Sequence, residues 1–318
     1  YSISYATLLR MFNARRDFMY IKSPCNWVGN KYKHLDKINE IVGGKEYERV
    51  IEPFMGTGNI LLNINAPAET YIGNDNIPLV PRLYSYMRNN DFYYSLEELE
   101  AIIESWNYFS DKEDYYVFRN YWNSKYSNNM YDKDFIYETV LLLKMCSNSM
   151  VRFNQKGEFN QGFRGLAKGK SEFFSNNMKD SIVSQLNLLS IALNNKNYRF
   201  MVGDFKDVLK ETTENDLIIL DPPYILRTDM YDMNFTEEDD AFLFDFLAYT
   251  KSDFLYFNYL ESGRMINKKM NDLFGSTKHK VLRVENISDK TMAGQGRKST
   301  KKVKEVIDGL FTITRINY

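Results

Sequence analysis

The sequence predicts an α/β fold in which a doubly wound parallel sheet is interrupted by a mostly helical insertion. Short apolar runs bounded by turn residues predict buried strands, and stretches with helical spacing lie between or after them. Strands that alternate with helices form a parallel sheet covered on both faces. Between about residues 78 and 195 this rhythm is broken and the apolar spacing becomes mostly helical.

The strands of the sheet are predicted at Arg49–Phe54, Tyr71–Asn74, Tyr198–Val202, Asp216–Leu220 and Asp253–Asn258. Helices are predicted at Asn59–Ile64, Ser181–Leu193 and Glu237–Thr250. Four acidic residues open the last of these helices, where the helix dipole favours negative charge. Near the C-terminus, the patterns predict two strands joined by a polar loop, at Lys280–Asn286 and Glu305–Arg315. At residues 1–20 we expect a short helix that packs against the rest of the protein.

The insertion begins with an aromatic, acidic region at Tyr84–Tyr131, whose rings we expect to be core rather than a base-stacking platform. A long apolar helix is predicted at Asp134–Cys146, and a polar, basic segment follows at Ser147–Lys170. We therefore expect one domain built from residues 1–77 and 196–318, and a second domain at residues 78–195.

The chain has 318 residues and a formal net charge of −1, from 41 Lys+Arg and 42 Asp+Glu. Taken alone, this balance argues against a polyanion-binding protein. The charge is nevertheless segregated, because Lys144–Lys170 holds six cations and one acid, and Lys290–Lys304 holds six cations and no acid. Phosphate binding requires such clusters on one surface. A solvated, flexible loop is the alternative interpretation of each cluster.

Rare residues exclude several classes of site. Cys25 and Cys146 lie far apart with no CxxC spacing, which argues against a disulfide framework and a cysteine zinc site and favours a reduced, cytoplasmic setting. His34 and His279 are the two histidines, so we expect no histidine-based metal site and no Ser-His-Asp triad. No segment approaches the ~20 apolar residues that span a membrane. We expect no metal and no membrane partner.

Three loops at one edge of the predicted sheet indicate a nucleoside-like ligand. Gly56 and Gly58 follow the first strand, where glycine allows a sharp turn and close approach of a ligand. Asp75 ends the next strand, a position from which an acidic residue accepts hydrogen bonds from ribose hydroxyls. After the third strand, Asp204 is placed to accept from an adenine amine and Phe205 to pack on the ring. The spacing is not GxGxxG, which favours a mononucleoside over a dinucleotide.

The strand Asp216–Leu220 runs directly into Asp221-Pro222-Pro223-Tyr224. The prolines end the strand and leave the Asp221 carboxylate and the Pro222 carbonyl as acceptors beside the Tyr224 ring. Two acceptors and an aromatic face suit a planar group that bears an NH2. Accepting both hydrogens of an adenine amine favours its pyramidal form and prepares the nitrogen to attack an activated methyl group.

These motifs together resemble the Dam-type (D12 class) family of S-adenosylmethionine-dependent DNA adenine-N6 methyltransferases, including its phage members. The resemblance covers about residues 22–316 in one consistent order. It rests on the N-terminal motif Trp27-Val28-Gly29-Asn30-Lys31, the Gly-rich motif Phe54-Met55-Gly56-Thr57-Gly58 and the catalytic motif Asp221-Pro222-Pro223-Tyr224. The segment Asn148–Asn154, followed by Lys156–Asn160, resembles the target-recognition hairpin of this family.

The resemblance implies a Rossmann-like methyltransferase sheet, S-adenosylmethionine as cofactor and double-stranded DNA as partner. It implies that the flipped adenine is held by Asp221, Pro222 and Tyr224. The residues that would line the cofactor site are Trp27, Lys31, Phe54, Gly56, Gly58, Asp75, Asp204, Phe205 and Asp221. The insertion would be the target-recognition domain.

Within that domain, Arg152 is expected to read a guanine edge, which suits its bidentate fork. The other residues expected at the DNA are Asn148, Met150, Asn154, Lys156, Arg164, Arg297 and Lys298. The family suggests GATC as the target. Gly162 stands where members commonly have proline, and because this position lies in the reading element the exact target stays open. The biological role also stays open between restriction-modification, escape of a phage from restriction and replication control, and we expect a monomer or weak dimer.

Two alternatives to this function remain. One is an amino-methyltransferase that acts on cytosine N4, RNA or a protein amide. The other is a DNA-binding module that has lost catalysis, against which the intact Gly56, Gly58, Asp75 and Asp221 argue. Pro24-Cys25 is similar to the nucleophile motif of cytosine-C5 methyltransferases but precedes the Gly-rich loop, so we expect Cys25 to be a packed thiol.

Overall fold

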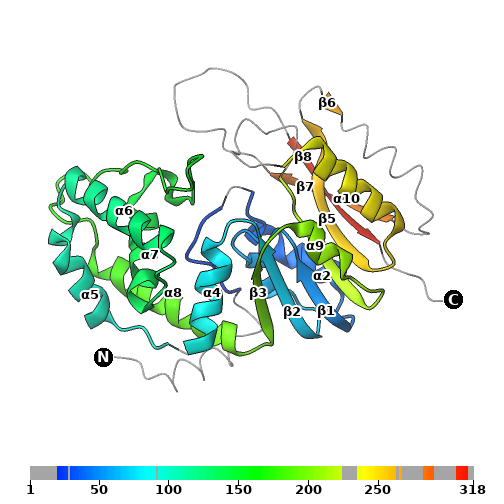
Figure 1. The fold of residues 1–318 in the computed structure, drawn as a ribbon, viewed down its shortest axis with the longest axis horizontal. Helices are drawn as coiled ribbons and strands as arrows, with labels where there is room; N and C mark the ends of the chain where they lie inside the picture. Colours follow the sequence, from blue (N-terminus) through cyan, green and yellow to red (C-terminus); the bar gives the residue numbers. More distant parts are fainter. Residues whose placement is uncertain are drawn as a thin grey trace.

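The computed structural model describes residues 20–27, 29–90, 92–223, 235–262, 265–266, 282–289 and 306–313. Within them the strands form one eight-stranded sheet (Figure 1) in the order β3-β2-β1-β4-β5-β8-β7, with β6 paired to β5. The strands are β1 (Tyr47–Glu52), β2 (Ala68–Asp75), β3 (Tyr198–Val202), β4 (Asp216–Leu220), β5 (Asp253–Ser262), β6 (Met265–Ile266), β7 (Leu282–Asp289) and β8 (Val306–Ile313).

Neighbouring strands from β3 through β5 pair in parallel, whereas β8 is antiparallel to both β5 and β7. The predicted doubly wound α/β fold is therefore confirmed, as is the strand pair near the C-terminus. Two strands are longer than predicted. β2 begins at Ala68 because its polar start pairs with β1, and β5 continues to Ser262 because its second half pairs with β8.

Alternation along β4 shows that the sheet is covered on both faces. Ile218 and Leu220 belong to a cluster with α9 (Phe205–Lys210) and α10 (Glu237–Tyr249), whereas Leu217 and Ile219 belong to the larger core cluster on the other face. The short helix α2 (Leu35–Val42) contributes to that larger cluster. Burial of one such aliphatic side chain contributes about 1.5–3 kcal/mol. Strands buried on both faces are therefore continuous apolar runs rather than alternating ones.

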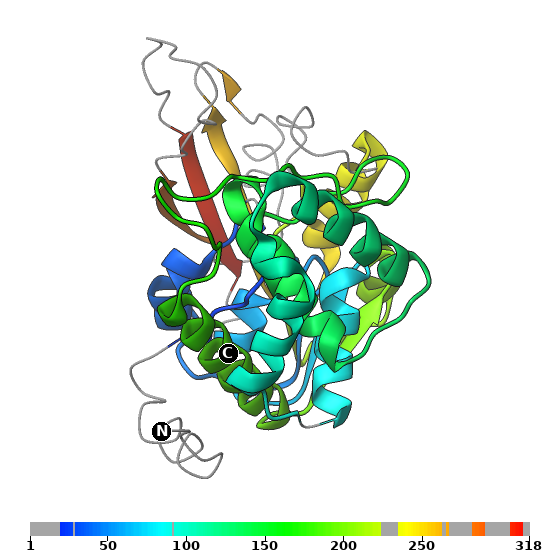
Figure 2. The same cartoon turned by 90° about the vertical axis from the view of Figure 1, so that its left-hand side faces the viewer.

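Five helices of the insertion lie between β2 and β3: α4 (Leu79–Asn90), α5 (Leu96–Ser105), α6 (Lys112–Ser127), α7 (Lys133–Met145) and α8 (Asn176–Asn194). Helix α4 packs against β3 and β2, and the others gather beside the β3 edge as a helical lobe (Figure 1). Figure 2 shows this lobe in front of the sheet. Helix α8 is longer than predicted and begins after Ser175, five residues earlier than the expected Ser181.

Aromatic side chains form the centre of the helical lobe. Tyr115, Phe118 and Trp122 of α6 are fully buried, and Trp122 stacks on Phe135 of α7 with ring centroids 5.2 Å apart. The Trp122 indole N–H donates to the Thr139 hydroxyl at 2.9 Å, so its polar atom is also satisfied. Most rings of the region are therefore core, as predicted, whereas Tyr93, Tyr108 and Tyr121 are exposed.

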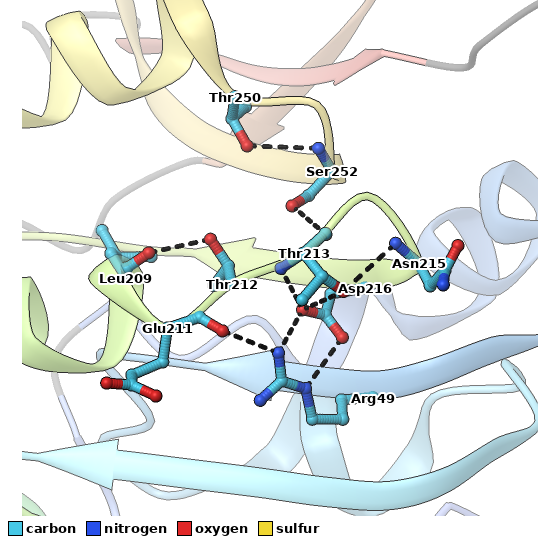
Figure 3. Close-up of polar contacts among 9 residues, drawn as sticks. All are labelled: Arg49, Leu209, Glu211, Thr212, Thr213, Asn215, Asp216, Thr250 and Ser252. Carbon is cyan, nitrogen blue, oxygen red and sulfur yellow. Dashed lines mark hydrogen bonds and ion pairs between the residues drawn. The ribbon is translucent and has the colours of Figure 1, made fainter.

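A polar network fixes the start of β4, the strand that leads to Asp221 (Figure 3). The Arg49 guanidinium donates to both oxygens of the fully buried Asp216 carboxylate, at 2.9 and 2.7 Å, and to the Glu211 carbonyl at 2.8 Å. Asp216 also accepts from the Thr213 backbone at 2.6 Å, and the Ser252 hydroxyl donates to the Thr213 carbonyl. Since bidentate pairs of this kind fix geometry, the network sets the register of β4 against β1.

Some predictions concern residues outside the part of the chain that the structure describes. These are the helix predicted within residues 1–19, Val28 of the N-terminal motif, Tyr224, and the basic segment Lys290–Lys304 with Arg297 and Lys298. Among the helices within the described ranges, none combines the length and apolar character required to cross a bilayer.

Candidate active site

A cavity of about 410 Å³ lies at the carboxyl ends of the central parallel strands. Glu52 ends β1 and Asp75 ends β2, while Gly203 and Asp221 directly follow β3 and β4. Ligands of doubly wound sheets bind outside this edge, where the loops diverge. The three loops that the sequence analysis assigned to one nucleoside-like site therefore meet around one cavity, together with the Asp221 loop.

The Gly-rich loop between β1 and the short helix α3 (Asn59–Asn63) turns through two glycines with positive φ. Gly56 has φ 49° and lies in the lining, where an added Cβ would meet the Trp27 ring at 3.6 Å. Gly58 has φ 66° and is the N-cap of α3; it is not among the described lining residues. A Cβ there would lie 2.9 Å from Met55 Cε, so Gly58 shapes the loop from behind.

Asp75 links β2 to the Gly-rich loop. Its carboxylate accepts from the Gly56 backbone N–H at 2.8 Å and from the Ile77 N–H at 2.9 Å. Burial raises the pKa of Asp75 to about 6, although these backbone hydrogen bonds act in the opposite direction. Asp75 therefore titrates close to the physiological range, at the edge of the cavity.

Glu52 is a lining residue that the sequence analysis did not assign to the site. It is 3% exposed and accepts from the Leu61 backbone N–H at 3.1 Å. Burial raises its pKa well above the usual value, and the charges of Asp221 and Asp75 raise it further. A carboxyl residue at the end of an apolar strand, directly before a Gly-rich loop, is the signal that would have identified it.

Lys31 and Asp221 form an ion pair at the cavity. The Lys31 ammonium donates to both Asp221 oxygens at 2.7 Å and to the Gly29 carbonyl at 2.8 Å. It lies 5.2 Å from the centroid of the Phe257 ring, and the Lys31 side chain is 6% exposed. The pair joins the N-terminal motif to the loop after β4.

An aromatic wall closes one side of the cavity. The rings of Phe54 and Phe205 have centroids 4.6 Å apart, and Phe235 lies 6.1 Å from Phe54 and 5.9 Å from Phe205. Asp204 directly precedes Phe205 and caps α9 by accepting from the Lys206 backbone N–H at 2.8 Å. An apolar wall beside a carboxylate suits a flat heterocycle that carries an amine.

Most ionisable residues that line the cavity are acidic. Lys31 is the one cationic residue among the described lining residues, which include the carboxyl residues Glu52, Asp75, Asp204, Asp221 and Asp239. Asp239 pairs with Lys206, which lies outside the lining. Such a cavity favours a ligand that carries positive charge. Within the described residues, no cluster of histidine, cysteine, aspartate or glutamate side chains is arranged to hold a metal ion.

The structure brings most of the predicted cofactor and catalytic residues together. The lining contains Trp27, Lys31, Phe54, Gly56, Asp75, Asp204, Phe205, Asp221 and Pro222. It also contains residues not assigned from the sequence, among them Asn30, Glu52, Asn76, Phe235 and Asp239. Asp239 belongs to the acidic start of α10, which was explained by the helix dipole alone. Cys25 is 1% exposed and burial raises its pKa to about 12, which confirms a packed thiol.

The predicted recognition segment forms a hairpin that returns along α6. Isolated antiparallel bridges join Phe153 to Phe159 and Cys146 to Phe163. At its turn, the Asn154 side-chain oxygen accepts from the backbone N–H groups of Lys156 and Glu158, at 2.9 and 3.0 Å. Asn154, one of the expected DNA-contacting residues, therefore also builds the turn that presents the hairpin.

Other expected DNA-contacting residues lie along the same segment. Asn148 adopts φ 62° in a short 3-10 turn at Ser147–Ser149, while Arg152, Lys156 and Arg164 are exposed. Met150 follows that turn, and the next residue donates its backbone N–H to the Asn26 carbonyl at 3.0 Å. The recognition segment is thus hydrogen-bonded to the residue before the Trp27 motif.

Helix α6 supports the hairpin through Asn123. The Asn123 side-chain nitrogen donates to the Phe159 carbonyl at 3.1 Å, and its oxygen accepts from the Phe159 N–H at 2.8 Å. One turn earlier, Arg119 donates to the Gln161 carbonyl at 3.1 Å, and the Tyr115 hydroxyl donates to the same oxygen at 2.8 Å. These contacts were not predicted, because they join polar positions of one helix to a segment about 40 residues away.

Comparison with known proteins gives a family match over most of the chain. The model of the D12 class N6 adenine-specific DNA methyltransferases matches residues 27–289. The modification methylase StsI of Streptococcus sanguinis is 31% identical over 216 residues, which are 67% of this chain and 30% of that protein. The type II methyltransferase M.FokI of Planomicrobium okeanokoites is 28% identical over 247 residues, 75% of this chain and 35% of that protein.

A shorter relative matches over more of its own length. The DNA adenine methylase of Serratia marcescens is 26% identical over 200 residues, which are 62% of this chain and 65% of that protein. The aligned part of the chain thus spans about a third of the StsI and M.FokI proteins.

Proposed function

The chain belongs to the D12 class of N6 adenine-specific DNA methyltransferases, and on that premise we propose that it transfers a methyl group from S-adenosylmethionine to the N6 amine of a flipped adenine in duplex DNA. The observation that carries this proposal is the position of Asp221 and Pro222. They line the same cavity as the Gly-rich loop and Asp75. An amine acceptor site and a nucleoside-like cofactor site therefore share one space.

The residues of the cavity fit S-adenosylmethionine. The acidic lining suits its positive sulfonium and ammonium groups, and the apolar wall of Phe54 and Phe205 suits its adenine ring. The Asp75 carboxylate would accept from the ribose hydroxyls, since an ionised carboxylate has lone pairs beyond those used by two backbone N–H groups. Asp204 would accept from the amine of the cofactor adenine. When bound, the cofactor supplies a methyl group activated by its sulfonium.

Asp221 and Pro222 would hold the substrate amine. The Asp221 carboxylate and the Pro222 carbonyl accept its two hydrogens, which draws the nitrogen lone pair out of conjugation and toward the methyl group. The methyl group would pass from the sulfonium to this nitrogen, with the electron pair of the S–C bond left on sulfur. The nitrogen then loses one proton, for which the Asp221 carboxylate is the adjacent acceptor. Tyr224 would stack on the flipped base.

Recognition of the target would be the task of residues 78–195, with residues 1–77 and 196–318 forming the catalytic domain. The hairpin would enter a groove of the DNA, where Arg152 would read a guanine edge and the surrounding residues would contact bases or phosphates. The basic segment around Arg297 and Lys298 would contribute phosphate contacts from the catalytic domain. GATC is the proposed target by family resemblance.

The test is methylation of an unmethylated plasmid with S-adenosylmethionine, followed by digestion to nucleosides, mass spectrometry and sequencing of the modified sites. The expected product is N6-methyladenine within one short sequence. The product N4-methylcytosine, or methylation of RNA or protein in parallel reactions, would replace the adenine assignment. Binding of DNA without binding of the cofactor would instead favour a silent DNA-binding module.

A further inference from the structure

A second cavity of about 410 Å³ lies between the segment before the Trp27 motif and the helical lobe. Lys22 and Ser23 line it from one side, Lys144 from the end of α7, and Ser181 and Ser184 from α8. Among the described residues that line it, none is acidic. The lining therefore presents cations and hydrogen-bond donors and no carboxylate of its own, and the nearby Asp36 carboxylate accepts from the Tyr20 hydroxyl at 2.7 Å.

The two walls of this cavity are tied together. The side-chain amide of Gln185 in α8 donates to the carbonyls of Lys22 and Ser23, at 3.0 and 3.1 Å. These contacts hold Lys22 close to the lobe, so the cationic character of the cavity is built in by the fold. The Lys22 ammonium also lies 5.9 Å from the centroid of the Tyr32 ring, which lines the same cavity.

Lys144 carries a charge that its surroundings do not compensate. Burial lowers the pKa of its ammonium, and the positive charges of Lys22 and Arg164 lower it further. Lys22 lines the cavity with Lys144, whereas Arg164 acts on Lys144 from outside the lining. An anion placed between Lys22 and Lys144 would replace the repulsion between the two ammonium groups with attraction.

We propose that this cavity binds one phosphodiester group of the DNA backbone, beside the bases that the hairpin reads. The inference rests on the proposed function, which supplies the DNA. Charge complementarity selects the phosphate, and the Val151–Asn26 backbone hydrogen bond places the hairpin next to the segment that carries Lys22. Because the two lining cations come from the N-terminal segment and from α7, one bound phosphate also fixes these two parts relative to each other.

The test compares Lys144→Gln with the control Lys210→Gln, which causes the same change in net charge. Lys210 is exposed at the end of α9, where it pairs with Asp207. Affinity for a target duplex is measured by fluorescence anisotropy over a series of salt concentrations. We expect Lys144→Gln to bind several-fold more weakly and to reduce the slope of log affinity against log salt by about 0.9, the contribution of one phosphate. Lys210→Gln keeps the wild-type slope, and an unchanged slope for Lys144→Gln would refute the proposal.

A second measurement identifies the source of the phosphate. In a series of duplexes, one backbone phosphate at a time is replaced by a neutral methylphosphonate. Neutralising one particular linkage near the target should lower the affinity of the wild-type protein. The same replacement should leave the affinity of Lys144→Gln unchanged. If no linkage shows this difference and inorganic phosphate raises the melting temperature of wild-type protein but not of Lys144→Gln, the cavity holds free phosphate and the proposal fails.

Two further controls separate the possible failures. If Lys144→Gln is not folded by circular dichroism, Lys22→Gln is measured in the same way, since its exposed side chain leaves the core intact. These binding measurements need no methyl transfer. Absence of N6-methyladenine in the plasmid experiment would thus overturn the proposed function, while the salt slopes would still decide whether the cavity binds a DNA phosphate.

Discussion

The Lys31 ammonium lies 2.7 Å from both carboxylate oxygens of Asp221, although 190 residues separate the two side chains in the sequence. The contact joins the N-terminal motif to the loop that holds the proposed amine acceptors. Lys31 is anchored in turn by the Gly29 carbonyl and by the Phe257 ring. It therefore sets the orientation in which Asp221 would meet the substrate amine.

We predict that Lys31→Met lowers kcat on the order of 10²-fold, because Asp221 loses the group that orients it. Removal of one partner of a fully buried pair costs about 3–5 kcal/mol, and the partial exposure of Asp221 reduces this to about 1–3 kcal/mol of unfolding free energy. Steady-state methylation and urea unfolding measure the two effects. Lys37→Met removes an exposed ion pair and should change stability by no more than about 0.5 kcal/mol. Wild-type kcat in Lys31→Met would show that Asp221 needs no positioning partner.

Replacement of Asp221, the proposed amine acceptor, should lower methyl transfer more than Lys31→Met does. Asp221→Ala is expected to lower methyl transfer by about 10²–10⁴-fold while largely sparing DNA affinity. Single-turnover methylation and anisotropy on the same duplex measure the two quantities separately. Retained activity would remove the carboxylate from the proposed chemistry.

Cofactor affinity should depend on pH through Asp75. Burial raises the pKa of this carboxyl to about 6, so it is ionised above that pH and protonated below it. Ribose hydroxyls donate to the ionised form, so affinity is fully present well above the pKa of about 6 and falls as the pH decreases through it. A hydrogen bond to a charged group contributes about 1.5–3 kcal/mol, so the loss should reach about tenfold or more. Calorimetric titration from pH 5 to 8 should reveal this step in the wild type, and in Asp75→Asn weak binding without it. A flat wild-type profile would contradict the assignment.

The two glycines of the Gly-rich loop should respond differently to alanine. At Gly58, left-handed strain of about 1–2 kcal/mol adds to a Cβ contact of 2.9 Å with Met55. At Gly56 the strain is similar, but the new Cβ meets the Trp27 ring at an ordinary 3.6 Å. Gly58→Ala should therefore lower unfolding free energy more, whereas Gly56→Ala should mainly weaken cofactor binding. Urea unfolding and cofactor titration of both variants test this order, which the reverse ranking would overturn.

Discrimination between DNA sequences should depend on Arg152 and on the hydrogen bonds from Asn123 that hold the hairpin against α6. Arg152→Ala is expected to reduce preference for the target over a duplex with one changed base pair by about 1–3 kcal/mol. Asn123→Ala should produce a smaller loss of the same preference, because it frees the hairpin backbone at Phe159. The ratio of kcat/KM on the two duplexes measures both effects. Asn120→Ala, at an exposed position of α6, is the matched control. If Asn123→Ala lowered only the melting temperature and left that ratio unchanged, the residue would be structural.

Much of the fold was predictable because the strands of a covered parallel sheet are continuous apolar runs. β3 and β4 have the predicted bounds, and the loop residues that follow the strands lie at one edge. The helices of the aromatic region were less defined, since their rings are buried on several sides and leave no simple stripe. Their starts depend on caps such as Ser95, which accepts from the Glu98 backbone and forms a capping box.

The site was predictable where a local motif carries the chemistry, as in Asp221-Pro222. Contacts that depend on tertiary distance were not predictable, and the Lys31–Asp221 pair is the clearest example. Glu52 was missed because the first strand was predicted to continue to Phe54, whereas β1 ends at Glu52, at the edge where the cavity lies. Asn154 was expected at the DNA, while its role in the hairpin turn follows from hydrogen bonds that residue type alone does not specify.

The helical insertion leaves the sheet after β2 and returns at β3, two strands that are direct neighbours. Their ends are in register, with Asp75 opposite Val202, and because the strands are parallel the chain leaves β2 at the carboxyl edge of the sheet and enters β3 at Tyr198, on the amino edge. The insertion is therefore the crossover connection between two neighbouring parallel strands. A lobe of different size or shape can be accommodated there without moving any other strand. If residues 78–195 read the target as proposed, exchange of this one contiguous stretch of gene would give a descendant a new target, while the proposed chemistry at the strand ends would be inherited unchanged.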